Sequence, residues 1–307
     1  GNLDIARDTA NGKLIMVDFY TDWWSACNLL DANTFSNKKV SQYLNENFIN
    51  LKIDAETNYG NSLFTEYNGM GYPLLLFLDE NKNEIDRLYG FLDANTFLQK
   101  LIDIKKGKNT FPILQAQYEK GDNSGETMSI LASKYAERGD DSTAAILYQN
   151  VILSKNISSK MFLEAKYFLS SLELSKNSSS GYLALENYIN EYPQSPFTKE
   201  AVNKLLGFFK SNGLLDIEIS YFKKYVEIYS DDPWFLNQFS WRMTELNQNL
   251  NLALEKITHA LNIINDDVNG IANIIDTKAE VLWKMGRNKE AIDIINEAII
   301  LNPENEY

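Results

Sequence analysis

The chain has 307 residues, of which 44% are hydrophobic and 12% aromatic, so it can bury a large core and is expected to form two domains rather than one. Its formal net charge is −13, with 11 basic against 15 acidic residues up to Lys108 and 18 against 27 after it. Because both parts are acidic, neither offers the basic face that nucleic acid or anionic lipid would require of a partner.

Two further features of the sequence limit its class. No stretch approaches the roughly 18 to 20 consecutive apolar residues of a transmembrane helix, and no signal peptide is visible. The single cysteine, Cys27, allows no internal disulfide, so cysteine usage does not identify the redox compartment.

The first part of the chain, up to about residue 107, alternates between strand-like and helix-like patterns, as expected for an α/β domain. Nearly continuous apolar runs predict buried strands at 13–20 and 48–54, and the segment 73–90 is predicted to form two strands joined by a polar turn. Between and after these strands, amphipathic stretches predict helices at 36–47, 58–68 and 93–106.

Beyond about residue 109 the strand signals end and one local pattern recurs. A small or aromatic residue is followed four positions later by an aromatic or β-branched one, in the pairs Ala144/Tyr148, Ala184/Tyr188, Tyr221/Tyr225, Ala253/Ile257 and Ala291/Ile295. The intervals between successive pairs are 40, 37, 32 and 38 residues. A period in this range predicts stacked helical hairpins, here five of them.

The helix before each pair can often be matched as well. Its residues follow the spacing W-x2-L-G-x2-Y at Met128, Leu131, Ala132, Tyr135 and again at Leu236, Phe239, Ser240, Met243. Residues 110–307 therefore resemble the tetratricopeptide repeat (TPR) family. This resemblance implies a protein-binding scaffold whose stacked hairpins form a concave groove for a peptide or protein.

The segment 21–28, "TDWWSACN", follows the first predicted strand and begins a helix. Together with the residues before it, it resembles the active-site segment of the thioredoxin family, in which Trp-Cys-x-x-Cys follows a strand. On that resemblance Asp18 matches the buried acid, Trp23 the tryptophan, Trp24 the attacking cysteine and Cys27 the resolving cysteine. The segment "GYP" (71–73) resembles the family's cis-proline loop, which implies a cis bond before Pro73.

The departure from the family pattern decides the expected chemistry. Trp24 has no thiol, so attack on a substrate disulfide cannot begin at its position. Cys27 lies near a helix N-terminus, which favours a thiolate, but it matches the more buried position, where an apolar environment raises a thiol pKa. We interpret Cys27 as a buried remnant of a redox pair and Asp18 as a solvated or hydrogen-bonded structural acid. In the alternative interpretation, Asp18 accepts a proton from Cys27 and so tunes its reactivity.

Exposed aromatic residues predict the binding surface. Trp23 and Trp24 are adjacent at a helix start, so they cannot both point into the core, and we expect at least one to lie at the surface near Tyr72 and Pro73. Aromatic side chains beside a backbone-binding loop are typical of a peptide contact site. An interface with the helical repeats is the alternative role for the same residues.

The sequence thus predicts an α/β thioredoxin-like domain (1–108) followed by an all-α, TPR-like helical-hairpin solenoid (109–307). We expect no cofactor and no metal, because His259 is the only histidine and no glycine-rich nucleotide loop is present. The favoured function is a non-catalytic protein-interaction or chaperone-like module. The alternative is a thiol-disulfide oxidoreductase that uses Cys27 alone. Location in the bacterial envelope is implied only by the resemblance to thioredoxin-like domains of envelope proteins.

Overall fold

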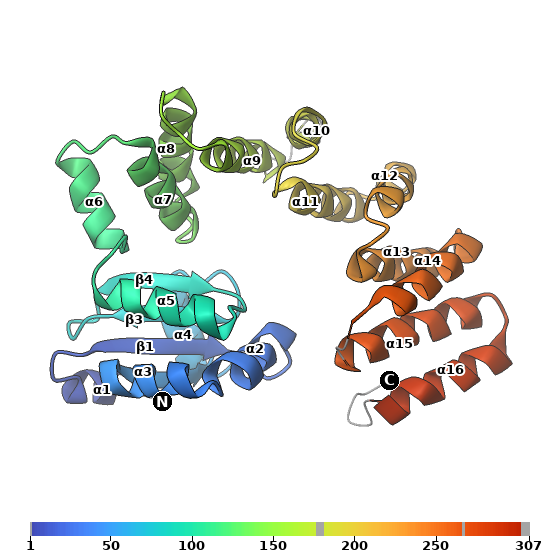
Figure 1. Cartoon of the computed structure of the whole chain (residues 1–307), viewed down its shortest axis with the longest axis horizontal. Helices are drawn as coiled ribbons and strands as arrows, with labels where there is room; N and C mark the ends of the chain where they lie inside the picture. The colour runs from blue at the N-terminus through green and yellow to red at the C-terminus, as the bar shows by residue number, and fades with distance from the viewer. Residues whose placement is uncertain (1, 176–180, 266–267, 302–307) are drawn as a thin grey trace. The chain divides into compact units, whose positions relative to one another are not determined.

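The computed structural model describes residues 2–175, 181–265 and 268–301 (Figure 1). The chain divides into two compact units, residues 1–197 and 198–307. The first unit holds the α/β domain and the helices that directly follow it, and the second holds further helices. The predicted domain boundary at 108/109 falls inside the first unit and stays a prediction.

A four-stranded sheet forms the centre of the α/β domain. Its strands are β1 (Leu14–Tyr20), β2 (Phe48–Asp54), β3 (Leu74–Leu78) and β4 (Glu84–Tyr89), in the order β2-β1-β3-β4. β1 is parallel to β2 and antiparallel to β3, which is antiparallel to β4. All three predicted strand regions are therefore confirmed, and the end of β1 lies beside the start of β3, where Phe19 pairs with Leu74.

Helices cover both faces of this sheet. They are α1 (Leu3–Thr9), α2 (Ser25–Leu29), the π-helical turn η1 (Leu30–Phe35), α3 (Lys38–Asn47), α4 (Asn58–Glu66) and α5 (Ala94–Lys105). On one face, α1 and α4 pack against the side chains of Ile15, Val17 and Phe19. On the other, α3, α5 and η1 pack around Met16, because successive strand residues point to opposite faces. The predicted helices are confirmed within a few residues, whereas α1 and η1 have no counterpart in the sequence interpretation.

Polar side chains fix where these helices begin. Asn2, Asn37, Thr57 and Asp93 precede α1, α3, α4 and α5, and each accepts hydrogen bonds from main-chain amides of the first helical turn. Such caps satisfy amide groups that have no partner within the helix, so the helices start at defined residues. The segment 21–28 differs, because Trp24 precedes α2 without a capping side chain.

The remaining described helices, apart from α6, form the hairpins that the repeat pattern predicts. The first unit has α6 (Phe111–Glu119), α7 (Gly125–Ala136), α8 (Asp141–Leu153), α9 (Ser159–Ser175) and α10 (Gly181–Glu191), and α7 pairs with α8 and α9 with α10. The second has α11 (Thr198–Ser211), α12 (Leu215–Ile228), α13 (Pro233–Leu246), α14 (Leu250–Ile263), α15 (Val268–Lys284) and α16 (Asn288–Leu301), paired in sequence order. The predicted fold class is confirmed: an α/β domain is followed by TPR-like helical hairpins.

The recurring residue pairs lie on the second helix of every hairpin. Ala144 and Tyr148 on α8 are both buried, as are Ala253 and Ile257 on α14. The alanines allow close approach of the neighbouring helix, and the larger residues fill the space between helices. Gly139, between α7 and α8, has a positive φ of 77°, which glycine adopts without a steric penalty.

A network of buried charges joins β4 to α7 within the first unit. Lys134 Nζ lies 2.5 and 2.7 Å from the two carboxylate oxygens of Asp86, and Arg138 binds Glu84 at 2.5 Å. Arg87 also binds Glu84 and donates to the main-chain carbonyl of Glu137 at 3.2 Å. Because these groups are largely withdrawn from water, each carboxylate depends on its cation partners, and the network ties α7 to the sheet.

Candidate functional site

Trp23 and Trp24 lie in the turn between β1 and α2, and both are exposed, at 63% and 43%. Their rings meet edge to face with centroids 5.5 Å apart. Trp23 Nε1 donates a 2.9 Å hydrogen bond to Glu56, which follows β2. The turn therefore presents two mutually oriented indole rings to solvent, which agrees with the expectation that at least one of them lies at the surface.

The loop before β3 lies at the same end of the sheet as the tryptophan turn, since β1 ends where β3 begins. Its Tyr72–Pro73 peptide bond is cis, as the thioredoxin resemblance implies. Tyr72 is half-buried, with its ring centroid 4.7 Å from that of Phe64. Burial raises the pKa of Tyr72, and the negative charge of Glu56 and the thiol of Cys27 act in the same direction. Tyr72 thus lies within electrostatic reach of the residue that binds Trp23.

Pro73 itself is buried, so its ring is not part of the exposed surface. Its carbonyl accepts a 3.0 Å hydrogen bond from Gly90 N, which follows β4. Of the four residues predicted to bind a partner, Trp23 and Trp24 are exposed, Tyr72 is half-buried, and Pro73 is buried.

Cys27 is a free cysteine with only 3% of its surface exposed. Burial raises the pKa of its thiol above the ordinary value. A main-chain hydrogen bond from Thr21 acts in the opposite direction, while the carboxylates of Asp18 and Asp31 raise the pKa further. Cys27 is the third residue of a five-residue helix, and the effect of burial outweighs any stabilisation of a thiolate at the helix start.

Asp18 is buried at 3% exposure, and its Oδ1 has no hydrogen-bond partner. Asp18 Oδ1 is therefore neither solvated nor hydrogen-bonded, which differs at this atom from the expected solvated or hydrogen-bonded acid. Burial raises the pKa of Asp18 to about 7, with the nearby charge of Lys52 opposing the shift and that of Asp31 adding to it. The physical reason is its position on β1, where the face that carries Met16 and Asp18 is covered by η1 and α3.

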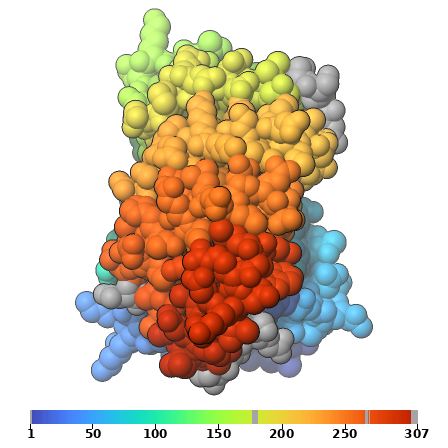
Figure 2. All heavy atoms as spheres, turned by 90° about the vertical axis from the view of Figure 1, so that its right-hand side faces the viewer, coloured from blue at the N-terminus to red at the C-terminus, as the bar shows by residue number. Residues whose placement is uncertain are grey.

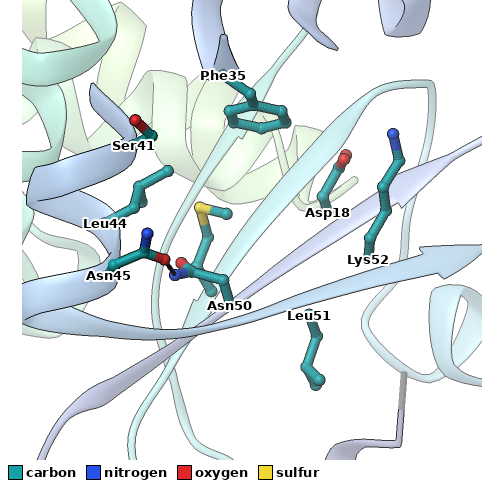
Figure 3. Close-up of a pocket in the computed structure, with 9 residues that line it drawn as sticks. Asp18, Phe35, Ser41, Leu44, Asn45, Asn50, Leu51 and Lys52 are labelled. Carbon is teal, nitrogen blue, oxygen red and sulfur yellow. Dashed lines mark hydrogen bonds between the residues drawn. The ribbon is translucent and has the colours of Figure 1, made fainter. Parts of the chain in front are cut away.

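Lys52 stands opposite Asp18 in the register of β1 and β2. It forms an ion pair with Asp31 of η1, and its Nζ lies 4.5 Å from the ring centroid of Tyr20. Figure 3 shows Asp18 and Lys52 projecting from the same side of their strands, whereas Leu51 points to the other side. They border a cavity of about 220 Å³ that Phe35 and Leu44 line with apolar surface.

The π-helical turn η1 positions the third member of this charged group. It follows α2 directly and carries Asp31, and Thr34 within it donates a 2.5 Å hydrogen bond to the carbonyl of Leu92. A π-helical turn widens the helix by one residue per turn and is often found at functional sites. The sequence analysis did not predict this turn, because its residues "LDANTF" show no pattern that distinguishes a π-helix from an α-helix.

The chemistry available at this site is limited. Over residues 2–175, 181–265 and 268–301, no group of three or more histidine, cysteine or carboxylate side chains could hold a metal ion. In the same parts of the chain, no helix is long and apolar enough to cross a membrane. What the site offers is a buried thiol, a buried acid and an exposed aromatic turn.

The helical part contains a groove as well. Within the second unit, α11, α12 and α13 border a hollow of about 270 Å³ with Asn203, Asn237 and Trp241 on its wall. Its charges are paired: Arg242 binds Glu218 at 2.6 and 2.9 Å, and Lys210 lies 3.2 Å from Glu245. Amide and aromatic groups therefore remain to contact a partner there.

Comparison with known proteins agrees with this geometry. Residues 2–80 match a protein-family model described as thioredoxin-like. The thiol:disulfide interchange protein DsbD of Yersinia pestis is 41% identical over 96 residues, which cover 30% of this chain and 16% of that protein. This chain thus matches only about a sixth of the length of that relative. The N-terminal part of the chain is thioredoxin-like.

Two solved structures are also similar. The C-terminal domain of DsbD from Neisseria meningitidis, in the reduced form, is 26% identical over 33% of this chain and 88% of its own, with a TM-score of 0.29. YrrB, described as a TPR protein with an unusual peptide-binding site, is 13% identical over 62% of this chain and 93% of its own, with a TM-score of 0.44. The TPR-like character of the helical part rests on its hairpins and recurring residue pairs.

Proposed function

We propose that this protein is a non-catalytic interaction module, in which a thioredoxin-like domain without an attacking thiol presents an aromatic surface and is followed in the chain by TPR-like hairpins. The observation that carries the proposal is the difference in exposure between the two residues that match the redox pair. Exposed Trp24 stands where the resemblance places the attacking cysteine, and the one thiol, Cys27, is buried.

Disulfide exchange requires a thiolate that reaches a substrate sulfur. The relatives named as thiol:disulfide interchange proteins supply the prior expectation of such chemistry. Here burial, Asp18 and Asp31 all disfavour a thiolate at Cys27, and Trp24 supplies no sulfur. These facts support binding over exchange.

The proposed partner is a protein or peptide. Exposed tryptophans supply large contact areas with little loss of side-chain freedom, so Trp23 and Trp24, with Tyr72 beside them, form the first proposed contact surface. The groove over α11 and α13 is the second. We also propose that the protein acts in the bacterial envelope, by analogy with the interchange proteins that its N-terminal part resembles.

The reactivity of Cys27 tests the non-catalytic assignment. Iodoacetamide should alkylate the native thiol at neutral pH at least about a hundredfold more slowly than the urea-unfolded thiol, because access and a thiolate are both lacking. The native protein should not reduce the disulfides of insulin. Rapid alkylation would overturn the non-catalytic assignment, and turnover that Cys27→Ser abolishes would establish the single-cysteine oxidoreductase.

A gain-of-function variant tests whether the redox frame remains. Trp24→Cys places two cysteines at the spacing of the family motif, and we expect it to acquire dithiol-dependent insulin reduction. The matched variant Trp23→Cys, one position away, should stay inactive. If both variants are inactive, the correspondence of Trp24 with the attacking cysteine is wrong.

Capture experiments test the binding surfaces. Partners cross-linked from an envelope extract should be lost on Trp24→Ala and retained on a substitution of an exposed residue elsewhere, such as Lys100→Ala. Capture that is insensitive to Trp24→Ala would remove the aromatic turn from the proposed contact surface.

A further inference from the structure

The C-terminal hairpin carries an apolar groove that no described element covers. Trp283 of α15 and Ile292, Ile295 and Ile299 of α16 line a hollow of about 620 Å³, which we call the terminal groove. Trp283 is 53% exposed, Ile292 61% and Ile299 43%. In Figure 2 this hairpin, in dark orange and red, lies at the surface that faces the viewer.

The preceding hairpin shows what normally occupies such a position. Ile257 on α14 matches Ile295 in the repeat pattern, and it is fully buried in the second unit, where α14 packs against α15. Leu254 and Leu261, which match Ile292 and Ile299, are half-buried. The face of α16 thus has the residue pattern of a surface that receives a helix.

Charge on the rim of the groove indicates the chemistry of that helix. Asp276 and Glu280 of α15 line the terminal groove, and at its edge Lys284 Nζ lies 4.5 Å from the ring centroid of Trp283. Burial raises the pKa of Asp276, with no cation contributing to the shift. Glu280 has Lys284 at 3.9 Å, a long and partly exposed pair. A carboxylate on an apolar wall is best stabilised by a cation from the occupant.

We propose that the terminal groove binds an amphipathic helix of another protein, whose apolar side chains contact Trp283, Ile292 and Ile299 and whose lysine or arginine side chains lie beside Asp276 and Glu280. Such a helix binds with the apolar side chains of one face in the groove and with its charged side chains at the rim. A second copy of this chain fits less well, since its net charge of −13 would bring further acid to an acidic rim.

The test uses the full chain and a fluorescent helical peptide with leucines at i, i+3, i+4 and i+7 and lysines at the flanking positions. A matched peptide carries glutamate in place of lysine. In anisotropy titrations at physiological salt, the lysine peptide should bind and the glutamate peptide should bind at least about tenfold more weakly.

Variants of the chain locate the contact. Ile292→Gln combined with Ile299→Gln should weaken binding of the lysine peptide by at least about tenfold, because two apolar anchors are lost. Ile300→Gln is the control, as Ile300 is 79% exposed on the same helix and lies outside the groove, and it should change the affinity less than about twofold. Asp276→Asn should weaken binding and reduce its dependence on salt.

Three results would overturn the proposal. The first is equal binding by all variants, which would show that the lysine peptide binds the acidic chain without a specific site. The second is equal affinity for the two peptides. The third is concentration-dependent dimerisation in sedimentation that Ile292→Gln abolishes, which would make a second copy the occupant.

Discussion

Asp18 on β1 and Asp86 on β4 are both buried carboxylates of the same sheet, but they differ in their ion-pair and hydrogen-bond partners. Asp86 has Lys134 on both oxygens and Arg138 3.7 Å away. Asp18 has Lys52 nearby, but Lys52 is paired with Asp31, and Asp18 Oδ1 has no hydrogen bond. The ion-paired carboxylate of Asp86 contributes to the stability of the fold, whereas a charged carboxylate at Asp18 lowers it.

The difference has a physical origin in the neighbouring elements. Lys134 of α7 and Arg138, just after that helix, bring two basic side chains to Asp86, whereas β1 is covered near Asp18 by Phe35 and Leu44. A buried carboxylate without a full set of partners lowers stability. Folding stability therefore gives no reason for Asp18, which stands at the position that the thioredoxin resemblance assigns to the buried acid.

The largest expected effect concerns Asp18 and pH. Its pKa is raised from 3.8 to about 7 in the folded protein, so the folded state binds more protons than the unfolded state between these values. The free energy of unfolding should therefore fall as pH rises from 4 to 8, by an amount on the order of 4 kcal/mol from this group alone.

Urea unfolding of Asp18→Asn across that pH range measures the effect. The variant should show a flatter pH dependence, match the unsubstituted protein at pH 4 within about 1 kcal/mol, and exceed its stability at pH 8. An unchanged slope would show that Asp18 is hydrated or paired in solution, and the contrast with Asp86 would disappear.

Lys134→Met tests the other side of the comparison. It leaves Asp86 buried without its principal cation and should lower the free energy of unfolding by about 3 kcal/mol at pH 7. An exposed lysine of α5 provides the control, since Lys100→Met should change stability by less than about 0.5 kcal/mol. Equal effects would mean that the network at β4 adds little to stability.

Substitutions of Cys27 should change the free energy of unfolding by a smaller amount, and they test whether water reaches this side chain. Cys27→Ala removes a buried sulfur and should cost about 1 kcal/mol, whereas Cys27→Ser should cost more because it buries a polar hydroxyl and the main-chain hydrogen bond at Thr21 only partly replaces its contacts with water. The measurement is again urea unfolding of the two variants. If serine is tolerated better than alanine, water reaches this site and the thiol is more accessible than its 3% exposure indicates.

The smallest expected effect belongs to Trp24. Because its side chain is 43% exposed, Trp24→Ala should change the free energy of unfolding by less than about 0.5 kcal/mol while abolishing partner capture. Phe97→Ala, at a fully buried position, should cost about 3 to 5 kcal/mol in the same assay. A large loss of stability in Trp24→Ala would identify Trp24 as a structural plug.

Much of this architecture follows from local patterns in the sequence. Continuous apolar runs fixed β1 and β2, and the small-to-aromatic pairs such as Ala144 and Tyr148 marked the second helix of each hairpin. The single cysteine in a thioredoxin-like segment located the candidate site. These features depend on residues close together in the chain.

The features that escaped prediction depend on residues distant in the chain. Lys134 and Asp86 are 48 positions apart, and their pairing follows only once α7 contacts β4. The unpaired Oδ1 of Asp18 depends on which side chains of η1 and α3 cover β1, and the buried Pro73 is hydrogen-bonded through its carbonyl to Gly90, 17 positions away. Long-range contact, rather than propensity, decides each of these.

The edge-to-face pair of Trp23 and Trp24 has an optical consequence. Two indole chromophores with centroids 5.5 Å apart couple their electronic transitions, so the pair should contribute a couplet to the ultraviolet circular dichroism. The other three of the five tryptophans lie far along the chain, at 234, 241 and 283. A ligand that parts the two rings would therefore change this spectrum without any added label, and the protein carries its own reporter of occupancy at the aromatic turn.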